Sequence, residues 1–133
     1  MSLLSRTAAA TLLTMLSAAP LYAEALDVRI GYLQWVPDKG PVLSNIIPEP
    51  EDAGLRGAEL GLADNQTTGR FLGQNYELET ELTGSHEEIL AAFEAMHDKG
   101  TRLFVINAPA QTVQAIMGRA GNNTLVFNAG AKN

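Results

Sequence analysis

The chain has 133 residues, no cysteine and a formal net charge of -6 at pH 7. The absence of cysteine excludes disulfides, thiolate nucleophiles and thiolate metal sites. The nine basic residues are scattered along the sequence, and an acidic chain without a basic stripe is a poor partner for nucleic acid. Apart from an N-terminal leader, about 110 residues remain, which is enough for one small hydrophobic core.

The N-terminal segment has the pattern of a cleavable signal peptide. Arg6 supplies a positive charge, residues 12–19 form a short apolar core, and cleavage can follow either Ala23 or Ala25. We therefore expect residues 1–25 to be a signal peptide and the mature chain to be exported to the periplasm. A membrane anchor is the alternative, but the apolar run is shorter than the ~20 residues of a membrane span, and no second run of that length follows.

A strand and a long irregular segment follow the leader. Apolar and polar residues alternate over residues 28–34, which predicts a central strand that ends near Gln34. Residues 35–52 contain four prolines, so the segment cannot be helix or ladder strand throughout. Irregular segments of this length are usually functional or disordered.

The next predicted elements are a helix and an edge strand. Asp52 can cap a helix from Ala53 to about Asn65, and residues 67–75 read as a turn-rich connector. Three glycines in this helix indicate close approach to a sheet, with a phosphate-binding loop as the alternative. Residues 76–82 alternate apolar residues with three glutamates, which is typical of an edge strand with one solvated face. A cation site on these glutamates is the functional alternative.

The second half of the chain predicts two further helix and strand pairs. Ser85 and Glu88 have the spacing of a capping box at the start of a helix that Gly100 terminates. Residues 102–107 form an apolar run typical of a central parallel strand that is buried on both faces. A helix over residues 110–120 and a last strand over residues 124–128 complete the pattern.

This alternation predicts an α/β fold with a parallel sheet of about four strands in the order 2-1-3-4 and flanking helices. In such a sheet, ligands bind beyond the carboxyl ends of the strands where the strand order reverses, here between the first and third strands. The candidate ligand-binding residues at this edge are Gln34, Trp35, Asn107, Ala108, Asn128 and Gly130. Trp35 can stack on a planar ligand or simply pack beneath the proline-rich segment.

Catalytic and metal-binding residues are not predicted. His86 and His97 lie at opposite ends of one predicted helix, where we expect them to face solvent rather than to form a ligand pair. No serine lies in a nucleophile elbow, and the carboxylates fall on expected surfaces rather than in an apolar pocket. We therefore expect a non-enzymatic protein without a cofactor or metal ion.

Three longer segments resemble a known family. The predicted order of elements resembles the first lobe of periplasmic substrate-binding proteins of the branched-chain amino acid ABC-transporter type. Within that superfamily, residues 51–61, 68–74 and 127–131 resemble the subfamily associated with pyrroloquinoline quinone-dependent alcohol dehydrogenase systems. The resemblance implies a type I periplasmic binding fold, of which residues 26–133 would be part of the N-terminal lobe. Its members continue beyond the Phe127–Ala131 segment, so we expect an incomplete lobe here.

The resemblance implies a solute-binding component that passes a small ligand to an inner-membrane ABC permease in the full-length protein. The ligand would be linked to quinoprotein alcohol oxidation, and pyrroloquinoline quinone itself is one possibility. Stacking on Trp35 and ion pairing with Lys39 or Arg56 would suit this planar anion. Alternatives are an extracellular sensing module of a receptor with the same fold, a flavodoxin-like enzyme, and a non-functional gene remnant.

Overall fold

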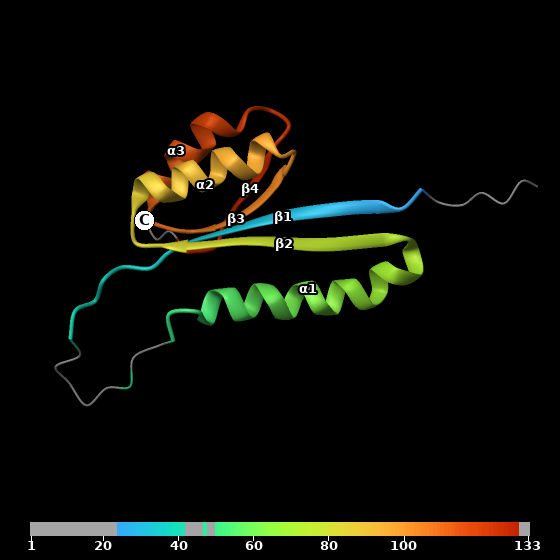
Figure 1. Cartoon of the computed structure of the whole chain (residues 1–133), viewed down its shortest axis with the longest axis horizontal. Coiled ribbons are helices and arrows are strands. Elements are labelled where there is room, and N and C mark those ends of the chain that lie inside the picture. The colour runs from blue at the N-terminus through green and yellow to red at the C-terminus, as the bar shows by residue number, and fades with distance from the viewer. Residues whose placement is uncertain (1–23, 42–46, 48–49, 131–133) are drawn as a thin grey trace, which may run out of the picture.

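The computed structural model describes residues 24–41, 47 and 50–130 (Figure 1). The predicted signal peptide lies outside these residues up to position 23. The elements in chain order are β1 (Leu26–Trp35), α1 (Ala53–Leu72), β2 (Gln74–Thr83), α2 (His86–Asp98), β3 (Leu103–Asn107), α3 (Ala110–Ala120) and β4 (Leu125–Asn128). No helix in the described part of the chain combines the length and apolar character needed to cross a membrane.

The four strands form one parallel sheet in the order β2-β1-β3-β4. This arrangement confirms the predicted α/β fold class and strand order. The register places Ile30 of β1 beside Leu78 of β2 and Leu103 of β3. Helix α1 covers one face of the sheet, and α2 and α3 cover the other (Figure 1). The chain places β2 on one side of β1 and then β3 and β4 on the other, so the strand order reverses between β1 and β3, as expected.

The hydrophobic core lies between the sheet and the layer of α2 and α3. It includes the fully buried side chains of Leu33, Phe93, Phe104, Ile106 and Ile116. Alternate residues of β1 and β3 point to this face because side chains alternate along a strand. The Phe93 and Phe104 rings pack in a tilted arrangement with their centroids 4.7 Å apart. This half of the molecule therefore has a closed core.

One of the two hydrogen bonds of the predicted capping box at the start of α2 is confirmed. The Ser85 hydroxyl accepts a hydrogen bond from the Glu88 backbone N–H at 3.3 Å. The Glu88 carboxylate instead accepts a hydrogen bond from the Thr83 hydroxyl, whose oxygen accepts from the Ser85 backbone N–H. Thr83 therefore takes the place that the Glu88 side chain has in a reciprocal capping box.

Helix α1 is longer than predicted. We expected a helix to about Asn65 followed by a connector, but the helix continues to Leu72. The Gln66 side chain accepts a hydrogen bond from the Tyr76 backbone N–H at 2.7 Å. The chain then reverses at Gly73, which has the left-handed conformation typical of a helix C-terminus (φ 68°). Tertiary contacts therefore override the low helix propensity of the segment.

The face of the sheet on the α1 side is only partly covered. Helix α1 lies along β2 and β1 (Figure 1), and just one of its 20 residues, Gly69, is buried. The prediction that β3 is buried on both faces is therefore wrong, since Leu103 and Val105 on this side are half-buried. On β4, Leu125 and Phe127 are 51% and 53% exposed. Their register with Leu103 and Val105 places them on the same open face.

The acidic edge of β2 is confirmed as a solvated surface. Glu77 lies 3.5 Å from Arg29, and Glu79 lies 2.8 Å from Lys99, so two of the three carboxylates have basic partners. These ion pairs are exposed and contribute little stability. The charges still discourage a second chain from pairing with this edge.

Candidate functional site

The six predicted ligand-binding residues lie near the carboxyl edge of the sheet but divide between its two faces. Gln34 and Asn107 are partners in the register of β1 and β3 and lie on the α1 side. Ala108 belongs to the core beneath α2 and α3, and Trp35 packs against that core. Asn128 is in register with Ile106, whose side chain also lies in that core. Successive side chains of a strand point to opposite faces, so Gln34 and Trp35, and likewise Asn107 and Ala108, lie on different faces of the sheet.

A hydrogen-bonded cluster lies on the α1 side of this edge. The Tyr32 hydroxyl donates to the Gln34 side-chain oxygen at 2.5 Å, and the Gln34 amide donates to the Glu51 carbonyl at 2.6 Å. These contacts connect β1 to the residues that precede α1. Tyr32 and Glu51 were not among the predicted site residues. Tyr32 and Gln34 are two residues apart on one predicted strand, so their side chains lie on the same face of the sheet. This spacing could have identified Tyr32 as a neighbour of Gln34 from the sequence.

The Tyr32 phenol is uncharged at neutral pH. Burial raises its pKa above the ordinary value because the phenolate would lose its hydration, and a hydrogen bond with Asn107 acts in the opposite direction. Only 2% of Tyr32 is exposed. The cluster therefore offers neutral hydrogen-bonding groups, not a charge.

Two glycines allow the backbone to approach this cluster closely. A β-carbon built on Gly54 would collide with the Tyr32 hydroxyl and would lie 3.0 Å from the Asn107 amide nitrogen. A β-carbon on Gly130 would collide with the Asn107 side chain. Gly54 therefore fulfils the expected role of a glycine that brings α1 onto the sheet. Gly57 and Gly61 do not, since a β-carbon on either would have no neighbour within 4 Å.

Trp35 has contacts that account for its position without a ligand. Its indole N–H donates to the Gly84 carbonyl at 2.9 Å, and its ring packs against the core beneath α2 and α3. The side chain is half-buried. These contacts favour the packing interpretation over the stacking platform.

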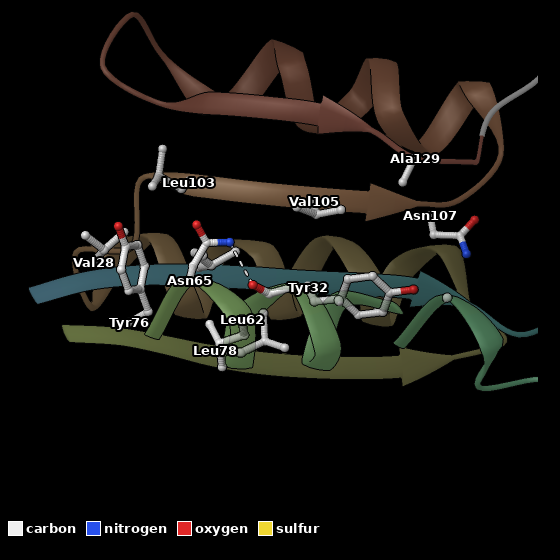
Figure 2. Close-up of a pocket in the computed structure, with 14 residues that line it drawn as sticks. Val28, Tyr32, Leu62, Asn65, Tyr76, Leu78, Leu103, Val105, Asn107 and Ala129 are labelled. Atoms are coloured by element: carbon white, nitrogen blue, oxygen red, sulfur yellow. Dashed lines mark hydrogen bonds between the residues drawn. The ribbon is translucent and has the colours of Figure 1, made fainter. Parts of the chain in front are cut away.

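A cavity of about 530 Å³ lies between α1 and the sheet, next to this cluster. Figure 2 shows Tyr32, Asn107 and Ala129 toward one end of it and Val28, Asn65 and Tyr76 toward the other. The remaining lining residues are Ile30, Gly54, Ala58, Gly61, Leu62, Leu78, Leu103 and Val105. None of the lining residues carries a charged side chain. The volume is within the range of small-molecule pockets.

Arg56, which the sequence offered as a partner for an anionic ligand, is already paired with two carboxylates. Arg56 forms ion pairs with Asp52 at 2.9 Å and Glu59 at 2.8 Å, and these carboxylates raise the pKa of its guanidinium. Asp52 occupies the N-cap position of α1 but makes no side-chain cap hydrogen bond there. No cluster of three metal-ligating side chains occurs within the described ranges.

The histidines are not free at the surface as predicted. His86 is half-buried and its Nδ1 lies 2.9 Å from the Thr112 hydroxyl, while His97 is half-buried with Nε2 3.1 Å from the Thr124 hydroxyl. Each histidine therefore connects α2 to a later part of the chain.

Comparison of the chain with family models, curated proteins and solved structures produced no match. Family membership and function are therefore proposals, which rest on the geometry of the sheet edge and on the resemblance of residues 51–61, 68–74 and 127–131.

Proposed function

We propose that this chain is the solute-binding component of a periplasmic ABC transport system, or the N-terminal part of such a component. The observation that carries the proposal is the neutral cluster of Tyr32, Gln34 and Asn107 at the reversal point between β1 and β3. In parallel α/β sheets this is the position where ligands bind. The cluster can orient a small molecule by hydrogen bonds.

The chemical character of the cluster favours binding over catalysis. Amide and phenol groups that are uncharged at neutral pH can donate and accept hydrogen bonds, but they are poor general acids or bases at that pH. Delivery of the ligand to an inner-membrane permease is the part of the proposal that comes from the family resemblance. The same resemblance suggests pyrroloquinoline quinone, substrates of quinoprotein alcohol oxidation and branched-chain amino acids as the first ligands to test.

The ion pairs of Arg56 and the packing of Trp35 bear on the choice among these ligands. Arg56 already has two carboxylate partners, and the Trp35 ring packs against the core. Neither residue is therefore presented to an anionic quinone in the way the sequence suggested. Neutral substrates of alcohol oxidation fit the described cluster better.

Asn107→Ala tests the proposed site in the full-length secreted protein. We expect the protein to bind at least one of the suggested ligands, as measured by isothermal titration calorimetry. Removing the carboxamide should weaken that binding by about tenfold, because a hydrogen bond in a desolvated site is lost. Asn123→Ala is the matched control, since Asn123 is exposed in the turn before β4. It should leave the affinity unchanged.

Two results would refute the proposal. One is that none of the suggested ligands binds while circular dichroism shows a folded protein. The other is that Asn107→Ala and Asn123→Ala change the affinity equally.

A further inference from the structure

Two close contacts between α1 and the sheet lie near the two ends of this cavity. Gly54 lies against the Tyr32 hydroxyl near the start of the helix. Gly69 lies against the Tyr76 ring near its end, where a β-carbon would be 2.7 Å from a ring carbon. The two glycines are fifteen residues apart, which corresponds to about 22 Å along a helix axis. Each contact pairs a glycine of α1 with a tyrosine of the sheet.

Between these contacts, two of the α1 residues that line the cavity are small. A β-carbon on Gly61 would have no neighbour within 4 Å, although this glycine lines the cavity. Ala58 also lines the cavity with a short side chain. Small residues in the middle of α1 thus leave open the space that larger side chains would fill. We call this space, bounded by Tyr32 and Tyr76, the α1 slot.

The α1 slot has apolar walls along its length and polar side chains toward its two ends. Its walls are aliphatic side chains from β1, β2 and β3, among them Ile30, Leu78 and Val105. Hydrogen-bonding side chains lie toward its ends, with Tyr32 and Asn107 at the carboxyl edge and Asn65 and Tyr76 at the other (Figure 2). The Asn65 and Tyr76 side chains donate to the Gly61 carbonyl and to Gln74, at 2.7 and 2.8 Å. The carboxyl-edge end adjoins the proposed binding cluster.

We propose that the α1 slot holds the apolar body of a neutral ligand whose single polar head lies at Tyr32 and Asn107. The inference deepens the proposed function by naming the ligand class, and its biological use rests on that function. A volume of about 530 Å³ suits a molecule of two or three rings or a branched chain of similar bulk. A charged ligand is disfavoured because no lining residue could pair with it to replace the water that it loses.

The two glycine contacts favour a small molecule over a docked helix. A helix with its side chains is about 10 Å across. The slot is lined by residues of α1 and of β1, β2 and β3, and both ends of α1 are already in contact with the sheet. A second copy of the chain is the competing occupant, because the slot residues Leu103 and Val105 continue into the open face at Leu125 and Phe127.

A pair of fluorescent probes tests the charge requirement on the full-length protein. N-phenylnaphthylamine is neutral and has one N–H group, and anilinonaphthalene sulfonate has the same body with an added negative charge. We expect saturable fluorescence enhancement with the neutral amine at one site per chain. Binding of the sulfonate should be weaker by about tenfold or more. Equal affinities for both probes would overturn the proposal.

Two variants of α1 locate the bound probe. Gly61→Leu places a side chain in the slot, and Gly57→Leu places the same side chain at an exposed helical position that does not line it. Gly61→Leu should weaken binding of the neutral amine by about tenfold or more, while Gly57→Leu should leave it within about twofold. Ala58→Phe fills the slot from a second position and should have the same effect as Gly61→Leu. Near-ultraviolet circular dichroism confirms that each variant is folded.

The remaining outcomes separate this inference from the proposed function. Binding of a suggested solute that depends on Asn107 but not on Gly61 or Ala58 would overturn the slot and leave the proposed function in place. Binding of the neutral amine in the slot, with no binding of any suggested solute, would retain the slot and refute the proposed transport role. Failure of the neutral amine to bind, together with a dimer in sedimentation velocity, would overturn the slot in favour of a second copy on the open face.

Discussion

Tyr32 connects the core of the molecule to its candidate site at the scale of a single residue. Its ring is buried in the sheet beneath the start of α1, and its hydroxyl donates to Gln34 at the carboxyl edge. Gly54 lies directly against that hydroxyl. The same atom therefore positions the binding cluster and the first turn of α1. Its loss should affect both stability and binding.

Tyr32→Phe should lower the free energy of unfolding by about 1 to 2 kcal/mol, because the buried Gln34 side-chain oxygen loses its donor. Tyr76→Phe is the matched control, since the Tyr76 hydroxyl also donates to a glutamine on its own strand but is less buried. We expect the control to cost less than about 0.5 kcal/mol. Urea denaturation at neutral pH measures both. Equal losses would contradict the special position of Tyr32.

The same substitution should change the response of stability to alkaline pH. Burial raises the pKa of Tyr32 in the folded state, so the folded protein keeps a proton that the unfolded chain releases near pH 10. The stability linked to this proton is fully present below that pH and is lost as the pH rises through the folded-state pKa. The native protein should therefore lose stability above about pH 10 more steeply than Tyr32→Phe does. Parallel profiles would contradict this assignment.

At the scale of elements, α1 is the most unusual part of the fold. It has 20 residues, buries almost none of them, and still extends beyond the region where its sequence favours a helix. Contacts at its two ends explain this behaviour, since Gly54 meets Tyr32 and Gly69 meets Tyr76. Gly73 then reverses the chain into β2 in a left-handed conformation. The helix is thus defined by its ends rather than by a continuous apolar stripe.

Gly73→Ala should destabilise the protein by about 1 kcal/mol, because a β-carbon is unfavourable at a φ of 68°. Gly118→Ala is the matched control. Gly118 lies in α3 with no neighbour within 4 Å of a built β-carbon, so alanine should stabilise the helix by up to about 1 kcal/mol. Thermal and urea denaturation measure whether each variant raises or lowers the free energy of unfolding. A shift in the same direction for both would contradict the assigned role of Gly73.

At the scale of the whole molecule, the two faces of the sheet differ. The face beneath α2 and α3 is closed by a core of fully buried side chains, including Leu33, Phe93 and Phe104. The opposite face is covered by α1 over β2 and β1 and is open over β3 and β4. Parallel sheets are normally covered on both faces. The open face is therefore the surface on which this chain should associate with other molecules.

Phe127→Ser should reduce concentration-dependent association of the protein, because it interrupts an apolar surface shared with Leu125. Phe71→Ser is the matched control. Phe71 is 88% exposed but lies on α1, away from the open face. Sedimentation velocity over a range of concentrations should show a larger effect for Phe127→Ser. Identical behaviour of the two variants would show that the open face is not the associating surface.

The sequence by itself determined the order of elements, the parallel sheet, the central position of β1 and the edge position of β2. Local periodicity is sufficient for these features, because alternation marks strands and the Ser85 and Gly100 signals mark helix ends. The helix over residues 110–120 was predicted with its observed bounds for the same reason. Strand order then followed from general rules for crossover connections. Gln34 and Asn107 could be selected in this way as neighbours at one sheet edge.

Only the tertiary structure decided the length of α1, the face on which each candidate residue lies, and the presence of the slot. Contacts between Gly69 and Tyr76 outweigh the low helix propensity of the segment, and no local pattern contains that information. The separation of Gln34 from Trp35 depends on which helices cover which face. The slot exists because short side chains of α1 face it between the contacts at Gly54 and Gly69, and the spacing of packed elements is a tertiary property rather than a local sequence pattern.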